Sequence, residues 1–520
     1  MMPSSLVPRP KRDPVLWLTE HQGIVLAALT VIYGLLAASA AARKPFWFDE
    51  ISTVYLSELR SPRDIWNAIY QGAELSPPLC FWSTWALQKV LGTGHVASRI
   101  PAMCGFWLMC LSLFFFVRRR SNAVHGLLAL ILPFLTSTSE YWVEARGYGM
   151  VLGFSAAALL FWQRTGDGGR FLDLAGLTLS LVVALGCHYY AAYLVAVLCL
   201  GEAIRSWERR RVHYGVWLAI AAGGASVLAY LPLILQNRRW AAPIWAAPTS
   251  SSLFASYSNL VAPGAILVLG VLAVSFLGAP RSDSEGGGWL PSPMPLSELA
   301  VCVALLAMPV SVFSAAVLVK LAFWPKYVMP SVIGYVILSA LFVYRVGGRG
   351  AWLVARILTV ALFVWFVPWA AWRAWVLVAH PGPEVTAAKE ALSPAPPNLP
   401  VVYSDDQDFT KMQYYLRGAP RERMVKLIDY QAAMKYMGFD QSERVLDVVG
   451  RLRPIPLRPY QEFVRQNRDF LVVRSSPSGW LMQALLADGA ELRLVEAFRR
   501  PGSTGSDTLV FLVRMPEKAP

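Results

Sequence analysis

Long apolar runs, separated by short polar or basic connections, dominate the first 372 residues of the chain. An apolar run of about 20 residues can cross the hydrocarbon core of a membrane as an α-helix. The pattern therefore predicts an α-helical polytopic membrane protein with about 11 transmembrane helices. The predicted spans are residues 22–42, 98–117, 123–140, 149–163, 171–187, 189–204, 214–235, 264–280, 297–320, 327–344 and 351–372.

The segment 43–97 is predicted to be one long external loop with helices that lie on the membrane surface. Within it, Pro77 to Leu91 is apolar, but at about 15 residues it is short for a span. This length suits an interfacial or re-entrant helix. A span here would also place Arg118, Arg119 and Arg120 outside, against the usual distribution of basic residues.

The pattern changes after Trp372, which ends a predicted transmembrane domain over residues 1–380. Residues 381–400 contain six prolines and are typical of a linker. Apolar runs at 401–403, 470–473 and 509–513 predict buried strands, and helical patterns lie around 409–417, 457–467 and 478–488. This alternation predicts a small soluble α/β domain over residues 401–520.

Composition and charge agree with a membrane protein of defined orientation. The chain is 56% hydrophobic and only 15% charged, whereas soluble domains average about 25% charged residues. The net charge of +14 does not indicate nucleic acid, because the basic residues lie beside short connections that the positive-inside rule assigns to the cytoplasm. We therefore expect a bacterial-type inner membrane protein with a cytoplasmic N-terminus and an extracytoplasmic C-terminal domain. The basic residues concerned are Arg9, Lys11, Arg12, Arg118, Arg119, Arg120, Arg164, Arg170, Arg205, Arg209, Arg210, Arg211, Arg281, Arg345 and Arg349.

Four polar clusters are predicted at the outer ends of the spans. Acids beside aromatics at a membrane boundary are costly to place, so they are functional candidates. Each cluster alone also has a simpler explanation, namely a solvated ion pair, a packing contact or interfacial anchoring. Together they outline an acidic centre surrounded by cations. Such a centre suits transfer from a lipid-linked phosphate, since cations stabilise the leaving group and a carboxylate accepts a proton. The clusters are Trp47, Asp49 and Glu50; Glu140, Glu144, Arg146 and Tyr148; His188 and Tyr189; and Lys326 and Tyr327.

The order of motifs over about residues 20–345 resembles the polytopic GT-C glycosyltransferases of the protein O-mannosyltransferase and aminoarabinose-lipid A transferase type. Two departures from the family pattern are Ser76, where the family has His, and Lys326, where it has Arg. The motifs are Phe48-Asp49-Glu50, Ser76-Pro77-Pro78-Leu79, Ser98-Arg99-Ile100-Pro101, Glu144-Ala145-Arg146-Gly147-Tyr148, His188-Tyr189-Tyr190 and Lys326-Tyr327-Val328-Met329-Pro330.

The resemblance implies inverting sugar transfer from a polyprenyl-phosphate donor to a hydroxyl or phosphate on a lipid, glycan or protein acceptor. It places the reaction on the non-cytoplasmic face, with Asp49 as general base. Further catalytic candidates are Glu50 and Glu144. The candidates for donor phosphate binding are Arg146, Lys326, His188, Tyr189 and Tyr327, and those for substrate binding are Tyr148, Trp47 and Glu140.

Cofactor use and two other function classes stay open at this stage. No Cys/His spacing indicates zinc, so no metal ligands are assigned, but carboxylates and phosphate oxygens can together hold a divalent cation. A transporter or flippase for a lipid-linked sugar is one alternative, although repeated halves with broken helices are not evident. A non-catalytic binding protein of the same fold is the other, but it could dispense with both acids.

Overall fold

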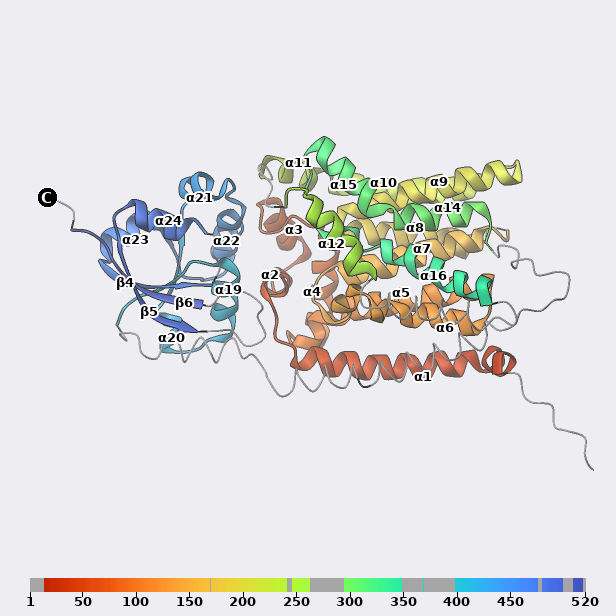
Figure 1. Cartoon of the computed structure of the whole chain (residues 1–520), viewed down its shortest axis with the longest axis horizontal. Helices are drawn as coiled ribbons and strands as arrows, with labels where there is room; N and C mark the ends of the chain where they lie inside the picture. The colour runs from red at the N-terminus through yellow and green to blue at the C-terminus, as the bar shows by residue number, and fades with distance from the viewer. Residues whose placement is uncertain are drawn as a thin grey trace, which may run out of the picture.

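The computed structural model of the chain describes residues 14–168, 170–240, 246–261, 294–347, 368, 398–475, 479–498 and 508–517. The helices of its N-terminal part lie side by side in one bundle, and an α/β domain (residues 398–517) lies at one end of that bundle (Figure 1). The predicted helical membrane fold with a small C-terminal sheet is therefore confirmed. Predicted spans 264–280 and 351–372, and residues 381–397 of the predicted linker, lie outside the described residues, so the number of 11 spans stays a prediction.

Three stretches among the described residues are long and apolar enough to cross a membrane as single helices, namely Trp17–Arg43, His95–Arg120 and Tyr214–Arg238. Two bent helix pairs would raise this number to five. The helices of the bundle are α1 (Pro14–Arg43), α5 (His95–Arg120), α6 (Ala123–Ile131), α7 (Tyr148–Thr165), α8 (Phe171–Cys187), α9 (Ala192–Arg209), α10 (Tyr214–Ala225), α11 (Leu231–Trp240), α12 (Ser250–Val261), α14 (Leu296–Leu306), α15 (Met308–Val319) and α16 (Ser331–Gly347). Short 3₁₀ helices connect them: η1 (Leu132–Leu135), η2 (Ser137–Val143), η3 (Tyr189–Ala191), η4 (Ser226–Tyr230) and η5 (Pro325–Val328).

Two of the predicted spans are bent rather than straight. Residues 123–143 form α6, η1 and η2, with a bend of 84° before η2, and residues 296–319 form α14 and α15, with a bend of 56°. Pro133 in η1 and Pro309 in α15 lie close to these bends. Proline removes a helical hydrogen bond and clashes with the preceding turn, so it favours a break. The first bend leads the chain from η2 directly into the Glu144–Tyr148 motif.

The external loop folds into three short helices, α2 (Phe48–Ser57), α3 (Pro62–Tyr70) and α4 (Leu79–Leu91). The Ser57 hydroxyl donates to the Phe81 carbonyl at 3.2 Å, which links α2 to α4. Ile51 and Val54 on α2 are fully buried. The helix that carries the acidic motif is therefore packed into the structure and is not a free loop.

Small residues let α5 and α7 approach closely. Gly149 and Gly153 lie one helical turn apart on α7 and face Ala102 and Gly105 on α5. A Cβ atom on Gly105 would lie 2.5 Å from the Gly149 carbonyl oxygen, closer than real Cβ contacts allow. Such small-residue contacts bring the backbones of membrane helices together. Because Arg99 lies on α5 and Arg146 just precedes α7, this contact fixes the spacing of two site arginines.

The α/β domain is built on a six-stranded sheet with the order β3-β2-β1-β4-β6-β5. Strands β1 to β4 pair in parallel, and β6 and β5 add antiparallel strands at one edge. Side chains alternate along β1, so that Val402 packs on one face and Val401 and Tyr403 pack on the other. The strands are β1 (Val401–Tyr403), β2 (Met424–Ile428), β3 (Leu457–Pro459), β4 (Asp469–Arg474), β5 (Glu491–Phe498) and β6 (Thr508–Arg514).

Helices cover both faces of this sheet, and α19 and α22 lie nearest to the transmembrane bundle (Figure 1). The three predicted strands correspond to β1, β4 and β6, and the three predicted helices correspond to α19, α23 and α24. The helices of the domain are α19 (Asp406–Tyr415), α20 (Ala419–Glu422), α21 (Tyr430–Met437), α22 (Gln441–Leu452), α23 (Tyr460–Gln466) and α24 (Trp480–Ala487).

Candidate active site

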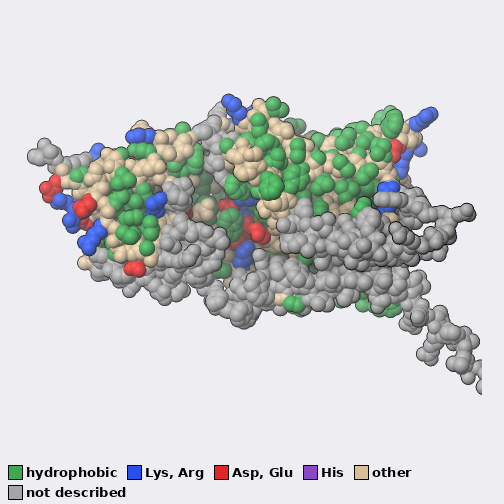
Figure 2. Space-filling view, in the orientation of Figure 1, with side chains coloured by type: hydrophobic (Ala, Val, Ile, Leu, Met, Phe, Trp, Pro, Cys, Tyr) green, Lys and Arg blue, Asp and Glu red, His purple; other side chains and the backbone are tan. Residues whose placement is uncertain are grey.

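A recess that contains acidic and basic side chains separates the α/β domain from the helical bundle (Figure 2). At this end of the bundle, the Lys326 ammonium lies 3.1 Å from a carboxylate oxygen of Asp49. Both side chains retain partial exposure, 17% for Lys326 and 19% for Asp49. The two residues are separated by 277 positions in sequence, so the fold alone brings them together. Both side chains are therefore partly accessible from outside the protein, which contact with a substrate would require.

Aromatic rings surround the Asp49–Lys326 pair. The Lys326 ammonium lies 5.6 Å from the centroid of the Trp47 ring and 5.4 Å from that of Tyr148. Such cation–π contacts hold an ammonium without neutralising it. Lys326 is therefore flanked by two aromatic rings while it pairs with Asp49.

Glu50 is fully buried and is bound by Arg99, which is also fully buried. The Arg99 guanidinium donates to both carboxylate oxygens, at 2.7 and 2.8 Å, and the Ala145 amide donates to one of them at 2.7 Å. Burial alone would raise the pKa of Glu50, but the bonds and charge of Arg99 hold that pKa below its ordinary value. Glu50 is therefore ionised and enclosed by protein groups.

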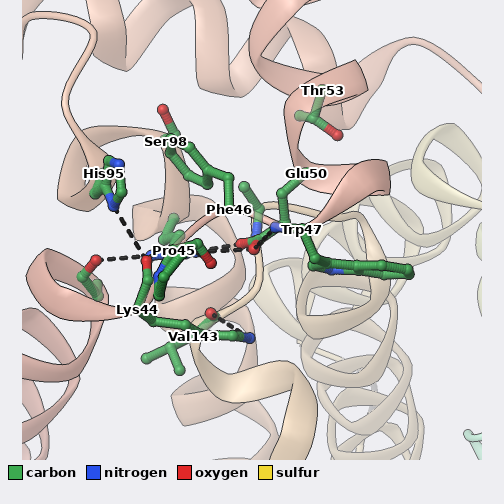
Figure 3. A network of polar contacts seen from close by, with 12 residues as sticks. Lys44, Pro45, Phe46, Trp47, Glu50, Thr53, His95, Ser98 and Val143 are labelled. Atoms are coloured by element: carbon green, nitrogen blue, oxygen red, sulfur yellow. Dashed lines mark hydrogen bonds and ion pairs between the residues drawn. The ribbon is translucent and has the colours of Figure 1, made fainter. Parts of the chain in front are cut away.

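The loop before α2 wraps around this buried pair (Figure 3). Arg99 Nη1 donates to the carbonyl oxygens of Ala41 and Lys44, each at 2.7 Å, and the His95 ring contacts the same Lys44 oxygen at 3.1 Å. The Lys44 ammonium donates to the Val143 carbonyl at 3.3 Å. Arg99 thus fixes the backbone that leads into Asp49.

Arg146 is paired with Glu74, a residue that the sequence analysis did not single out. Arg146 Nη1 donates to a Glu74 carboxylate oxygen at 2.7 Å and lies 3.4 Å from the Asp49 carbonyl and from the Thr53 hydroxyl. Burial would raise the pKa of Glu74, but the Arg146 charge holds that pKa below its ordinary value. Arg146 therefore supports the backbone of Asp49 as well as adding positive charge near it.

Glu144 differs from the other acids because one of its carboxylate oxygens, Oε1, is buried with no hydrogen-bond partner among the described residues. Burial raises the pKa of Glu144 to about 7, while the Lys44 charge opposes this shift. The side chain is only 6% exposed. Glu144 can therefore be protonated near neutral pH, whereas Glu50 and Glu74 stay ionised.

His188 stands at the centre of an aromatic cluster. Its ring centroid lies 5.1 Å from that of Tyr327, 5.5 Å from Tyr190 and 6.0 Å from Tyr148. Burial and the charges of Arg146 and Lys326 lower the pKa of His188 to about 4. His188 is therefore neutral and can offer a phosphate a hydrogen bond but no charge.

The structure gathers most of the predicted site residues, with two exceptions. Tyr189 packs instead with Leu56 and Ile65, against α2 and α3, and the neighbouring Tyr190 contacts His188 and Tyr327. Glu140 is exposed at the surface. Sequence reasoning missed Glu74, whose signal is an acid just before the Ser-Pro-Pro-Leu motif. Among the described residues, no group of three His, Cys, Asp or Glu side chains is arranged to hold a metal ion.

Comparison with known proteins supports the fold. No family model matches the sequence, and neither does any curated protein. Solved structures share the fold of this chain over both the helical bundle and the C-terminal α/β domain. Two of them are crystal structures of ArnT from Cupriavidus metallidurans.

The ArnT structure in the apo state gives a TM-score of 0.55 at 13% identity and covers 95% of this chain and 98% of ArnT. The ArnT structure bound to undecaprenyl phosphate gives a TM-score of 0.54 at 14% identity, with 96% and 98% covered. The likeness therefore extends over both the helical bundle and the α/β domain.

Proposed function

We propose that the protein is a membrane glycosyltransferase that moves a sugar from a polyprenyl-phosphate donor to an acceptor at the non-cytoplasmic face. The observation that carries the proposal is the partly exposed Asp49–Lys326 pair, 3.1 Å apart and flanked by the Trp47 and Tyr148 rings. A partly exposed carboxylate beside a partly exposed ammonium supplies a base and a phosphate ligand. The ArnT neighbour bound to undecaprenyl phosphate has the same fold and supports a lipid-phosphate partner.

In this proposal, Lys326 and Arg146 provide the positive charge that binds the donor phosphate. A phosphate that approaches Lys326 competes with Asp49 for the ammonium, so donor binding frees the Asp49 carboxylate. Arg146 adds a planar, permanently charged guanidinium. His188 and Tyr327 add hydrogen-bond donors close to Lys326, and the Trp47 and Tyr148 rings flank its ammonium.

The reaction is a single displacement at the anomeric carbon. The acceptor oxygen forms a bond to that carbon, while the bond from carbon to the phosphate oxygen breaks and polyprenyl phosphate leaves. Asp49 takes the proton of an acceptor hydroxyl, and cations stabilise the phosphate that departs. One base and one attack invert the configuration, through an oxocarbenium-like transition state.

The roles of the other two acids follow from their surroundings. Glu50 is fully buried against Arg99, so we assign it a positioning role for the α2 N-terminus instead of contact with substrate. Glu144 has an unpartnered oxygen and can accept or donate a proton near neutral pH, which makes it a reserve proton carrier close to Asp49.

The two alternatives identified from the sequence fit the geometry less well. A flippase needs a site near the membrane midplane, whereas the Asp49–Lys326 pair lies at the end of the bundle that carries the α/β domain. A non-catalytic binding protein needs Lys326 but has no use for Asp49. The sugar and the acceptor, whether lipid, glycan or protein, are not specified by the residues described.

The test is sugar transfer by the purified, membrane-reconstituted chain, with a set of undecaprenyl-phosphate-linked sugars as donors and released undecaprenyl phosphate as the readout. Asp49→Asn keeps the size of the side chain but removes the base. We expect its turnover to fall at least about 100-fold, the usual range for loss of a general base. Binding of undecaprenyl phosphate should persist, because Lys326 and Arg146 are unchanged.

Asp167→Asn is the matched control, since Asp167 is 65% exposed and pairs with Arg119 on α5, far along the bundle from Asp49. This variant should transfer sugar at the wild-type rate. Undiminished turnover in Asp49→Asn would overturn the proposed base. Outward movement of the intact lipid-linked sugar without release of undecaprenyl phosphate would instead support a flippase.

A further inference from the structure

The α/β domain contacts the segment just before the acidic motif. The Tyr415 hydroxyl, at the end of α19, accepts a hydrogen bond from the Phe46 backbone amide at 2.5 Å. Phe46 is 1% exposed, and its ring packs against the His95 ring at 4.1 Å and the Tyr414 ring at 5.9 Å. The domain therefore holds the chain three residues before Asp49.

A second contact holds the other end of α2. Arg453, just after α22, forms an ion pair with Glu58, the C-cap residue of α2. The same guanidinium stacks over the Tyr55 ring, 4.6 Å from its centroid. Val448 and Val449 of α22 join an apolar cluster with Leu56. The ten-residue helix α2 is thus bound by the domain at both ends.

Packing between these two contacts is incomplete. A small hollow separates Phe48 and Ser52 on α2 from Phe409, Thr410 and Gln413 on α19. The Thr410 hydroxyl and the Gln413 carbonyl oxygen are buried there without a hydrogen-bond partner among the described residues. Between the two end contacts, the domain is held on α2 by ring packing, with the Tyr55 and Tyr414 centroids 6.0 Å apart, and the two end contacts supply the hydrogen bond and the ion pair.

The opposite side of α2 is held by the transmembrane bundle. Arg99 binds Glu50, and its guanidinium lies 4.6 Å from the Phe46 ring centroid. Phe46 therefore contacts both parts of the molecule. Its amide donates to Tyr415 of the α/β domain, and its ring lies against Arg99 of the bundle. Movement of the domain would be transmitted through Phe46 to the start of α2, where Asp49 faces Lys326.

We propose that the α/β domain is a clamp that positions Asp49, with Tyr415 and Arg453 as positioning residues for the reaction. The domain thereby completes the active site without contributing a group that touches substrate. The effect on turnover rests on the proposed role of Asp49, whereas the clamp itself is a structural claim. A displacement of about 1 Å at a reacting group can lower the rate about 100-fold, so a small shift of α2 is enough to lower turnover.

Hydrogen exchange on the full chain in lipid nanodiscs tests the clamp independently of activity. In Tyr415→Phe, the Phe46 amide loses its acceptor, so peptides over residues 44–53 should exchange several-fold faster. In Arg453→Gln, faster exchange should appear over residues 54–58. Peptides from α5, residues 98–117, provide the internal reference and should not change. Tyr414→Phe is the matched control, because it removes a neighbouring hydroxyl that is not bonded to Phe46 and keeps the ring contacts.

Turnover supplies the second readout. We expect Tyr415→Phe to lower kcat about tenfold, within the range for a misplaced reacting group, while the Kd for undecaprenyl phosphate changes less than twofold. The double variant Glu58→Arg with Arg453→Glu reverses the ion pair, so it should restore the turnover that either substitution alone lowers. Unchanged exchange over residues 44–58 in both variants would overturn the clamp. If the wild type transfers no sugar but exchange responds as expected, the clamp stands and only the proposed reaction fails.

Discussion

At the scale of single residues, adjacent acids have opposite surroundings. Asp49 is partly exposed and faces one lysine, whereas Glu50 is enclosed by Arg99 and the Ala145 amide. One helical position, about 100° around the axis of α2, separates a candidate base from a structural ion. The family resemblance already favours Asp49 as the base, but the sequence cannot show which face of the helix is buried.

Glu144 gives a prediction about pH at the same scale. Because burial raises its pKa to about 7, the folded state binds more protons than the unfolded state between the ordinary carboxyl pKa and 7. Stability should therefore fall as pH rises through this window. Glu144→Gln removes the charge, so it should stabilise the protein by roughly 1–3 kcal/mol at pH 8 and by little at pH 5.

Thermal unfolding in detergent at the two pH values is the measurement. Glu50→Gln is the contrasting variant, because it leaves the buried Arg99 charge uncompensated and should destabilise by about 3–5 kcal/mol. Its effect should persist at both pH values. Equal stability of Glu144→Gln and wild type at pH 8 would show that Glu144 is already neutral or solvated there.

At the scale of elements, the sequence predicts helices and strands that have a hydrophobic pattern, but not the contacts that join distant segments. The external loop and the three strands β1, β4 and β6 follow from hydrophobic patterns, whereas the order of motifs is recognised only through the family resemblance. Strand β5 lies at a sheet edge and carries charged residues at Glu491, Arg493 and Glu496, so it lacks the continuous apolar run that predicts the other three strands. The Glu74–Arg146 and Tyr415–Phe46 contacts join distant segments and are set by the fold alone.

The close contact between α5 and α7 gives a prediction at the scale of elements. A side chain at Gly153 would collide with the backbone of Gly105, so Gly153→Leu must push the two helices apart. Overpacking of this kind costs about 1–3 kcal/mol, and sometimes more. We expect a lower unfolding temperature by scanning fluorimetry. Gly23→Leu on α1 is the control, because nothing lies within 4 Å of a Cβ atom there. Equal losses in both variants would contradict a specific role for the contact.

At the scale of the whole molecule, charge and architecture indicate the same orientation. The arginines that end α5, α7 and α9 meet at one end of the bundle, where Arg119 pairs with Asp167 and Arg209 donates to the Gly166 carbonyl. The α/β domain and the Asp49–Lys326 pair lie at the other end (Figure 1). The positive-inside rule assigns the arginine-rich end to the cytoplasm, so we propose that the candidate site faces outward.

Labelling of single introduced cysteines in intact bacterial cells tests this orientation. Asp167 is 65% exposed at the arginine-rich end, and Glu517 is 77% exposed in the α/β domain. A membrane-impermeant maleimide should label Glu517→Cys in intact cells and Asp167→Cys only after permeabilisation. The six native cysteines lie in apolar segments and supply the background, measured on the unmodified chain. The reverse labelling pattern would place the Asp49 recess in the cytoplasm, where a donor presented at the outer face could not reach it.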